Sequence, residues 1–196
     1  PLIYRSDLLP ARYRGNLFCC EPSQNLVHRC LVEREEGGFR VRRAAEETAS
    51  EFLASTDRWH RPMNLYVDAD GALIVVDLYR EIIEDYSAIP RHLQQQYGLI
   101  EGHDRGRLWR GVLRDTKPAK PVDLTKLDLP ALVASLASGN SWRRETAHRL
   151  LVELDDPQQR VAAGARLRQL AAEASLPETR MRALVVLESL GGLEPA

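Results

Sequence analysis

The chain has 196 residues, with 27 Lys and Arg against 28 Asp and Glu, so its formal net charge is -1. This length is enough for one large domain or two small ones. The near-neutral balance argues against a dedicated nucleic-acid binder, because such proteins need an excess of Lys and Arg to displace counterions. No apolar run approaches the length of a membrane-spanning helix. Three cysteines without C-x-x-C spacing argue against a disulfide framework, a zinc knuckle and a c-type haem site.

The first part of the chain, up to about residue 112, has the pattern of short strands separated by turn residues. Strands are predicted over residues 16–20, 26–32, 39–42, 63–67 and 72–76. The last two form the clearest hairpin, because Asp70-Gly71 between them tolerates the positive φ of a tight turn. An excursion over residues 77–104 follows, helical at 90–97, and residues 106–110 are predicted to close the sheet.

The second part begins after a proline-containing polar linker, K-P-A-K-P-V-D-L-T, at residues 117–125. Helices are predicted over residues 129–137, from a cap at Ser141, from Asp156-Pro157 to about residue 174, and from Pro177 to Gly191-Gly192.

In the helix that starts at Ser141, the apolar side chains share one face while three polar side chains face water. The apolar set is Trp142, Ala147, Leu150, Leu151 and Leu154, and the polar set is Arg143, Arg144 and Glu145. The last helix carries Met181, Ala183, Leu184 and Leu187. Helix starts about 37 residues apart are typical of helical repeats, and two helix pairs cannot bury their outer faces alone, so we expect further repeats. The first residue is proline, without a signal-peptide pattern, so we expect a piece of a longer protein.

Four segments carry a family resemblance: YRGNLFCCEPSQNLVHR, EFLASTDRWHRPMNLYVDADGALIVVDLYREIIE, DRGRLWR and NSWRRETAHRLLVE. Over nearly its whole length, the chain resembles the membrane-bound dehydrogenases of planctomycetes, verrucomicrobia and their relatives. These combine a sorbosone/glucose-dehydrogenase-like six-bladed β-propeller with HEAT-like helical repeats, and many end in a cytochrome c domain. The chain departs from the family pattern after Glu84, where Asp85-Tyr86 stand in place of a histidine and a proline.

The resemblance implies a multidomain β and α fold. Residues 1–115 would be the C-terminal part of a β-propeller, residues 116–126 a linker, and residues 127–196 HEAT-like repeats. Antiparallel strands within a blade would bring residues 24–25, 60–64 and 77–81 to one face. The candidate residues for cofactor or substrate binding on that face are Arg61, Asn64, Asn25 and Arg80.

Arg61 is the strongest of these candidates. In related propeller dehydrogenases, arginines just before an inner strand contact pyrroloquinoline quinone (PQQ), and a guanidinium suits its carboxylates and ring. The alternative is an arginine that ties the blade loops together by pairing with Asp77 or Glu81. Asn25 lacks the charge for a cationic contact, and its commoner role is to tolerate a turn backbone.

The remaining polar residues of the strand part have structural alternatives. Asp77, Arg80, Glu81 and Glu84 form a charged patch that could bind calcium or supply an acid and a base, but such clusters are more often solvated ion pairs. His103-Asp104-Arg105 fits ordinary turn chemistry. His28 is predicted to have a hydrogen-bonded structural role, whereas His60 lies on the predicted face. Cys19 and Cys30 are interpreted as packing residues.

Two functions remain open. The first is a fragment of a quinone-dependent sugar or alcohol dehydrogenase that passes electrons to a cytochrome c, with PQQ and calcium as cofactors and haem c outside this chain. Its location would be periplasmic or membrane-associated, and neither a catalytic base nor a metal ligand is assigned here. The fragment alone would be inactive.

The second is a non-catalytic scaffold that binds a protein or polysaccharide through residues 78–104, the helical repeats and an exposed Arg143-Arg144 pair.

Overall fold

The computed structural model describes residues 1–83, 87, 89–96, 98–99, 101–112, 114 and 120–193. The chain divides into two compact units. The sheet unit comprises Pro1–Asp68 and Ala72–Lys117, and the helical unit comprises Ala69–Gly71 and Pro118–Ala196. Part of the predicted linker at residues 116–126 lies outside the described residues.

The first sheet of the sheet unit is an antiparallel meander in the order β1-β2-β3-β4, and β5 pairs with β3 beyond the end of β4. Its strands are β1 (Leu2–Ile3), β2 (Leu17–Glu21), β3 (Leu26–Glu35), β4 (Gly38–Arg43) and β5 (Leu53–Ala54). Strand β3 runs past the predicted residues 26–32, because β4 pairs with it as far as the Glu35–Gly38 pair. Ion pairing between Glu33 and Arg42 supports this exposed extension of the hairpin.

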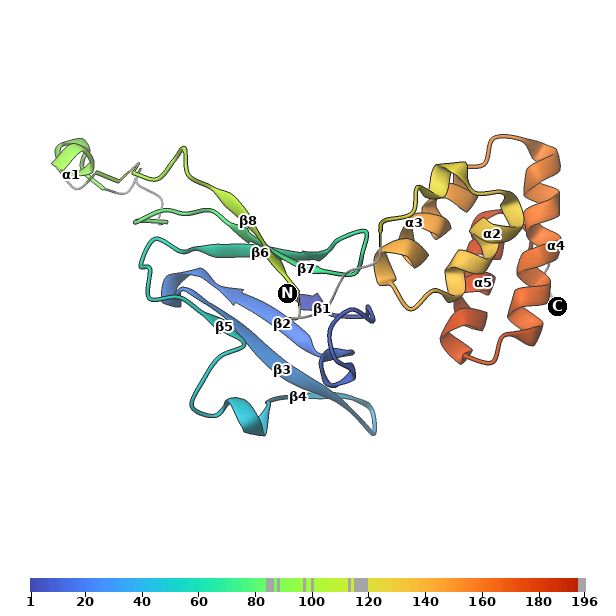
Figure 1. Cartoon of the computed structure of the whole chain (residues 1–196), viewed down its shortest axis with the longest axis horizontal. Helices are drawn as coiled ribbons and strands as arrows, with labels where there is room; N and C mark the ends of the chain where they lie inside the picture. The colour runs from blue at the N-terminus through green and yellow to red at the C-terminus, as the bar shows by residue number, and fades with distance from the viewer. Residues whose placement is uncertain are drawn as a thin grey trace. The chain divides into compact units, whose positions relative to one another are not determined.

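The second sheet is a three-stranded antiparallel meander of β6 (Pro62–Val67), β7 (Leu73–Asp77) and β8 (Arg107–Gly111). The predicted hairpin is confirmed, and Gly71 in its turn has a φ of 92°. Strand β8 confirms the predicted last strand and pairs with β7. Strand β6 lies beside β2 of the first sheet (Figure 1).

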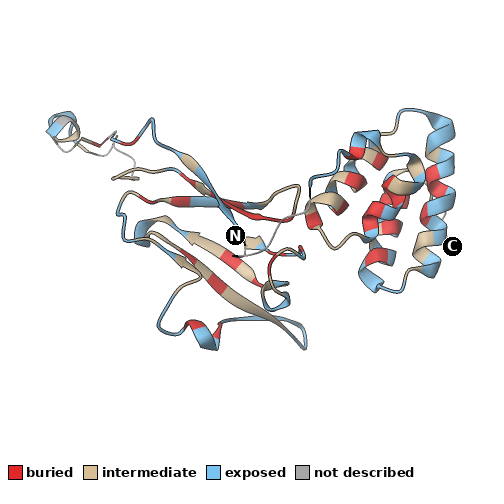
Figure 2. Cartoon of the chain, viewed as in Figure 1, coloured by how far each residue is buried: buried red, intermediate tan, exposed pale blue. Residues whose placement is uncertain are grey.

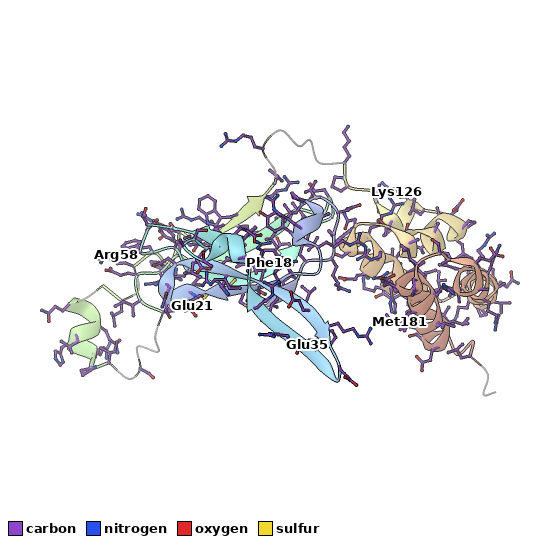
Figure 3. All side chains as sticks on the ribbon, turned by 90° about the horizontal axis from the view of Figure 1, so that it is seen from below. Phe18, Glu21, Glu35, Arg58, Lys126 and Met181 are labelled. Carbon is purple, nitrogen blue, oxygen red and sulfur yellow. The ribbon has the colours of Figure 1, made fainter. Side chains whose placement is uncertain are left out.

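The two sheets share one apolar core. Its buried members are Tyr4, Leu9, Phe18, Val27, Leu65, Leu73 and Val75. Figure 3 shows Phe18 among the sheets, where its ring meets that of Phe52 edge-on with 4.7 Å between centroids. Strand β7 is the most buried strand in Figure 2, because side chains on both of its faces are covered. The sheet unit is thus held by contacts between two open sheets.

A long connection joins β7 to β8. It contains α1 (Arg91–Gln96), within the predicted helix at residues 90–97. Figure 1 shows α1 at the far end of this connection from the strands. Residues 84–86, 88, 97 and 100 of this connection lie outside the described part.

The helical unit contains the four predicted helices. They are α2 (Leu129–Ala134), α3 (Ser141–Val152), α4 (Pro157–Glu173) and α5 (Pro177–Ser189), and a 3-10 turn at Ser135–Ala137 continues α2. Their core includes the predicted Ala147, Leu151 and Leu187, with Trp142, Leu150 and Leu154 packed against it. Met181 and Leu184 instead lie outside this core, and Figure 3 shows Met181 projecting from α5. Ala183, Val186 and Leu187 form the buried face, which has helical spacing.

Two details of α3 correct the sequence predictions. The N-cap is Asn140, whose Oδ1 accepts a hydrogen bond from the Arg143 backbone N–H at 3.3 Å, and Ser141 is the first helical residue. Arg144 does not face water: it is 3% exposed and donates to the carbonyls of Ser138 and Gly139 at 2.6 and 2.9 Å. A guanidinium can be buried there because these carbonyls follow the preceding 3-10 turn and need donors.

The other predicted helix ends are confirmed. Asp156 caps α4 by accepting from the Gln158 backbone N–H at 2.9 Å, and Gly191, with a φ of 71°, follows α5. A search of the described residues finds no helix with the length and apolar character needed to cross a membrane.

Candidate functional site

The three loops predicted to converge do meet at one end of the two sheets. The Asn25 side chain donates to the carbonyls of Arg58 and His60, the former at 3.2 Å. Arg61 reaches the Pro22 carbonyl at 2.9 Å, and the Leu78 backbone N–H donates to the Arg61 carbonyl at 2.9 Å. The loops before β3, before β6 and after β7 therefore form one hydrogen-bonded structure.

Asp77, the last residue of β7, lies at the centre of this structure. Its Oδ2 accepts from His60 Nδ1 and Trp109 Nε1, each at 2.9 Å. Its Oδ1 accepts from the backbone N–H groups of Arg61 at 2.8 Å and Tyr79 at 3.0 Å. The carboxylate is fully buried, so these four donors replace the water that it loses. We call His60, Asp77 and Trp109 the Asp77 triad.

The environment keeps Asp77 ionised. Burial alone would raise the pKa of its carboxyl, but the hydrogen bonds from Trp109, the Arg61 backbone and His60 outweigh burial and lower the pKa below the ordinary value. A carboxylate that accepts from His60 Nδ1 fixes the ring orientation and selects the tautomer with the proton on Nδ1. In the neutral imidazole, Nε2 is then the hydrogen-bond acceptor.

His60 Nε2 is buried and has no hydrogen-bond partner among the described residues. His60 is also among the residues around a pocket of about 360 Å³ in the sheet unit, which opens to the surface beside the 46% exposed Trp109. The first sheet contributes residues around β5 to this pocket, and the second sheet contributes β7 and β8. The other lining residues are Phe52, Leu53, Ser55, Leu73, Val75, Trp109, Arg110 and Gly111. The walls are therefore mainly apolar, with His60 among the few polar groups.

Arg61 ties the loops together through backbone carbonyls and not through carboxylates. Its Nε donates to the Arg80 carbonyl at 2.8 Å, its Nη1 to Pro22 at 2.9 Å and Ser23 at 3.5 Å, and its Nη2 to Glu81. A guanidinium has five N–H groups. With four hydrogen bonds already made, it cannot also present a free bidentate fork to a ligand.

The other three candidate residues, Asn25, Asn64 and Arg80, also have structural roles in the turns and loops where they lie. Asn25 has a left-handed backbone, with a φ of 59°, as predicted for a turn asparagine. Asn64 lies at the bulge between β6 and β7, and its Oδ1 accepts from the Leu65 backbone N–H at 2.8 Å. Arg80 donates to the carbonyls of Gly102 and of His103, the latter at 3.3 Å, and thereby joins the two ends of the β7–β8 connection.

The predicted charged patch is divided between buried and exposed groups. Asp77 belongs to the triad, whereas Glu81 forms an ion pair with the exposed Arg58. Glu84 lies outside the described residues. Among the described residues, no group of three or more His, Cys, Asp or Glu side chains could hold a metal ion.

The sequence analysis missed a second buried charge, Arg29 on β3. Arg29 is 1% exposed and pairs with Glu46 and Glu47, and its Nη1 donates to Asn16 Oδ1 at 3.1 Å. The only sequence signal was a basic residue at a buried position of a strand, two residues after Val27.

His28, Cys19 and Cys30, for which structural roles were predicted, lie on β2 and β3. His28 Nδ1 lies 2.6 Å from Glu51, as expected for a hydrogen-bonded structural histidine. Cys19, Cys20 and Cys30 are free thiols of intermediate burial. Burial raises the pKa of the Cys20 and Cys30 thiols, which makes them less reactive than an exposed cysteine.

PQQ and calcium are the cofactors implied by the family resemblance. The residues that would contact PQQ here, Arg61, Asn25 and Arg80, already direct their side chains to backbone carbonyls. They do not fit the quinone as free charged contacts. The described carboxylates also provide no calcium cluster. We therefore derive no reaction step through either cofactor on these residues.

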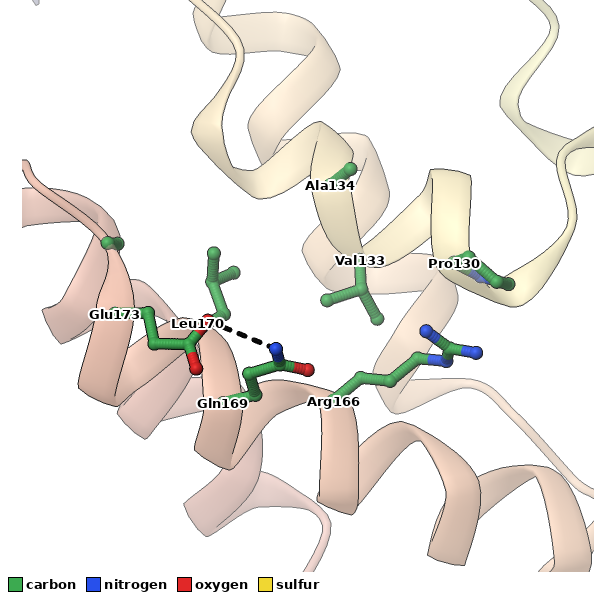
Figure 4. A pocket seen from close by; sticks show the side chains of 8 residues that line it. Pro130, Val133, Ala134, Arg166, Gln169, Leu170 and Glu173 are labelled. Atoms are coloured by element: carbon green, nitrogen blue, oxygen red, sulfur yellow. Dashed lines mark hydrogen bonds between the residues drawn. The ribbon is translucent and has the colours of Figure 1, made fainter.

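The helical unit has a separate groove between α2 and α4. Figure 4 shows Val133 and Pro130 on one side and Arg166, Gln169 and Leu170 on the other. Its volume is about 340 Å³, and Gln169 Nε2 donates to the Glu173 carboxylate at 3.0 Å along its edge. An apolar floor with a polar edge is a common feature of protein-binding grooves.

The family model described as a domain of unknown function, DUF7133, matches residues 1–115, which correspond closely to the sheet unit. No curated protein matches the chain. No solved structure matches it either.

Proposed function

Because the chain belongs to the DUF7133 family of unknown function, we propose a role for it from its geometry: the sheet unit forms two adjacent blades of a β-propeller. In this proposal the propeller belongs to a longer quinone-dependent sugar or alcohol dehydrogenase that passes electrons to a cytochrome c. The blades of this chain hold one face of the propeller together, and the groups that contact PQQ and abstract the substrate proton lie on other blades.

The arrangement of the strands supports this proposal. Each sheet is a consecutive antiparallel meander, and the first strand of the second sheet lies beside β2 of the first. Successive propeller blades have this order and pack face to face. Open sheets with exposed edges also require neighbours, and a propeller provides them.

The proposed role rests mainly on the hydrogen bonds that the Arg61 guanidinium makes to backbone carbonyls. Its guanidinium joins the loop before β3, which belongs to the first sheet, to the loop after β7, which belongs to the second. Asp77 holds the loop before β6 and the loop after β7 from inside the sheets. We therefore assign Arg61 and Arg80 to positioning the loops of this face, and not to binding the quinone.

The test uses the natural protein that carries this sequence, supplied with PQQ and calcium. We expect PQQ to bind and a dye to be reduced when sugars or alcohols are added. The Arg61→Lys variant should lose thermal stability, while the PQQ dissociation constant of its folded form should change less than about threefold. A folded natural protein that neither binds PQQ nor reduces the dye would overturn the dehydrogenase assignment.

A scaffold is the second candidate, and the groove between α2 and α4 favours it. An amphipathic segment of another protein could place apolar side chains against Val133 and Leu170 while polar groups meet Arg166 and Glu173. The prediction that Arg143 and Arg144 form an exposed contact surface is wrong in part, because Arg144 is buried. HEAT-like stacking of these helices remains part of the proposal, supported by the packing of α4 against both α5 and α2.

The scaffold is tested by changing the groove. Val133→Ser together with Leu170→Ser should abolish partner binding, measured with the natural protein against fractionated proteins and polysaccharides from its own cells. Val161→Ser, at a 75% exposed position of α4 that does not line this groove, is the matched control and should have no effect. Equal binding by all variants would remove the groove from the interface.

A further inference from the structure

Strand β8 is an edge of the second sheet that the proposed loop-positioning role does not use. Among the described residues it pairs with β7 alone, whereas the first sheet continues to a fourth strand, β4. In an antiparallel sheet, alternate residues of an edge strand point their N–H and C=O groups away from the neighbouring strand. Strand β8 also exposes two large apolar side chains, Leu108 at 61% and Trp109 at 46%. An edge of this kind can accept a further strand.

The pocket of about 360 Å³ lies beside this edge. Trp109 and Gly111 of β8 line it, together with Phe52 and Leu53 from the first sheet. These three side chains are partly exposed, so they form apolar walls that another molecule can reach. Trp109 and Gly111 both face the shared core, because each is paired with a core residue of β7. A strand added beyond β8 places the side chains opposite these two residues on the same face, next to the pocket.

From this arrangement, we propose that β8 binds an extended segment of a partner protein as a fourth, antiparallel strand, and that an apolar side chain of this segment enters the pocket. Backbone hydrogen bonds to β8 supply affinity, and the pocket selects the side chain. Gly111 leaves room for that side chain, because it has no side chain of its own. Binding at β8 does not depend on PQQ or on dehydrogenase activity.

The charges of the edge determine the chemistry of the partner. Residues 104–112 contain three arginines and one aspartate. Arg107 stacks over the Tyr79 ring, 3.6 Å from its centre, and Arg110 Nε lies 4.0 Å from the Asp68 carboxylate. The edge therefore has a net positive charge. A segment with acidic side chains opposite Arg107 and Arg110 complements it, because opposite charges on paired strands attract.

Charge also argues against a second copy of this chain as the partner. Two β8 strands paired with each other would bring their arginines together, and like charges on paired strands are destabilising. Strand β4, the edge of the first sheet, has its charges neutralised within one hairpin: Arg42 Nε donates to the Glu33 carboxylate at 2.8 Å. On β7, the carboxylate at the position opposite Arg107 is that of Asp77, which already accepts four hydrogen bonds.

The experiment uses the heptapeptide acetyl-TLEVTET-amide. Antiparallel pairing with β8 places its leucine opposite Gly111, its valine opposite Trp109 and its two glutamates opposite Arg110 and Arg107. The peptide is titrated into the 196-residue chain by isothermal calorimetry, and amide exchange is followed by NMR. We expect a dissociation constant on the order of 0.1 mM. Alternate amides over residues 107–111 should exchange more slowly when the peptide is bound, which distinguishes strand addition from other modes of binding.

Two changes separate the pocket from the charged edge. The peptide with serine in place of leucine should bind about tenfold more weakly, because it lacks the apolar side chain that enters the pocket. Arg110→Glu reverses one charge of the edge and should weaken binding of the original peptide about fivefold. Arg34→Glu, at an exposed position of β3 in the first sheet, is the matched control and should leave the dissociation constant within about twofold.

Three results would overturn the proposal. Absence of peptide binding by the folded chain would show that the β8 edge does not accept a strand. Equal affinities for the leucine and serine peptides would remove the pocket from the interface, and this comparison needs no variant of the chain to fold. Slow exchange of every β8 amide in the natural protein before peptide is added, measured by mass spectrometry, would show that a strand of the protein itself or of a second copy already covers the edge.

Discussion

The sheet unit and the helical unit are stabilised in different ways. The helical core consists of apolar residues such as Leu136, Leu151 and Leu167, all 0% exposed. The sheet unit also has an apolar core, but it buries the charged side chains of Arg29 and Asp77 next to it, each 1% exposed. The comparison shows that the helices are held mainly by packing, whereas the sheet unit also depends on buried charged side chains and their hydrogen bonds.

The difference follows from the backbone of each unit. A helix satisfies most of its own N–H and C=O groups, so its partner needs only to cover the apolar face. The loops before β6 and after β7 have no such internal pattern, and the Asp77 carboxylate and Arg61 guanidinium supply the missing acceptors and donors. Arg144 is the corresponding residue of the helical unit, at the turn before α3.

The largest expected effect concerns the helical core. Leu151→Ala removes a fully buried side chain from the centre of the helical unit and should lower its free energy of unfolding by about 3 kcal/mol. Urea unfolding followed by far-ultraviolet circular dichroism measures it. Leu184→Ala, at a 44% exposed position of α5, is the control and should cost less than about 1 kcal/mol. Equal losses would contradict the assigned core.

Asp77→Asn should produce the largest polar effect. The asparagine amide NH₂ would face N–H donors that now meet a carboxylate oxygen, so the free energy of unfolding of the sheet unit should fall by about 2 kcal/mol. Tryptophan fluorescence in a Trp142→Phe background reports this unit through Trp59 and Trp109. Asp104→Asn, at an exposed position, should change stability by less than about 0.5 kcal/mol. A stable Asp77→Asn variant would show that the triad is not structural.

Acid should destabilise the sheet unit before the helical unit. Because the pKa of Asp77 is lower in the folded state than in the unfolded chain, the unfolded state takes up its proton first as the pH falls. The stabilisation is complete at neutral pH and is lost from about pH 4 downward, through the folded pKa. Hydrogen bonding to Arg29 lowers the pKa of Glu46 in the same direction.

Urea midpoints between pH 7 and pH 3 measure this effect, with fluorescence reporting the sheet unit and circular dichroism the helices. In the helical unit, hydrogen bonds from Thr125 and Lys126 lower the pKa of the Asp123 carboxyl, but this carboxylate is 49% exposed and therefore contributes less to stability than the buried Asp77. A helical midpoint that falls as steeply as the sheet midpoint would show that the two units do not differ in this respect.

The smallest expected effect is at a helix cap. Asp156→Ala removes the side-chain acceptor for the Gln158 backbone N–H and should cost about 1 kcal/mol in the helical unit. Asp155→Ala is the adjacent control, because no cap bond involves Asp155 in the described structure of α4. Circular dichroism during urea unfolding distinguishes the two variants. If both variants lose the same stability, the cap does not depend on the Asp156 side chain.

The elements were predictable from the sequence to different extents. The helices and the hairpin at residues 63–76 follow from local periodicity and turn residues, and the structure confirms them. The burial of Arg144 was not predictable, because Arg143 and Arg144 are adjacent, identical residues, and only the carbonyls of the preceding turn distinguish them. The sequence also could not show that Asn140, and not Ser141, is the N-cap of α3, since both residue types cap helices well.

The candidate site was predictable in its location but not in its chemistry. The blade arrangement implied by the family resemblance was what placed residues 24–25, 60–64 and 77–81 together in the prediction. The partners of Asp77 were not predictable, because Trp109 lies 32 residues away, beyond the long β7–β8 connection. Within the described residues His60 Nε2 has no hydrogen-bond partner, which depends on that packing and has no sequence signal.

The central claim is that the Arg61 guanidinium is bound to backbone carbonyls and is not free for a cofactor. NMR of arginine side-chain N–H groups in the 196-residue chain tests it directly, with Arg61→Lys used to assign the signal. The account predicts a separate Arg61 Nε–H resonance that exchanges slowly with water. A resonance that coincides with those of exposed arginines and exchanges as fast as they do would contradict the account and return Arg61 to the list of cofactor contacts.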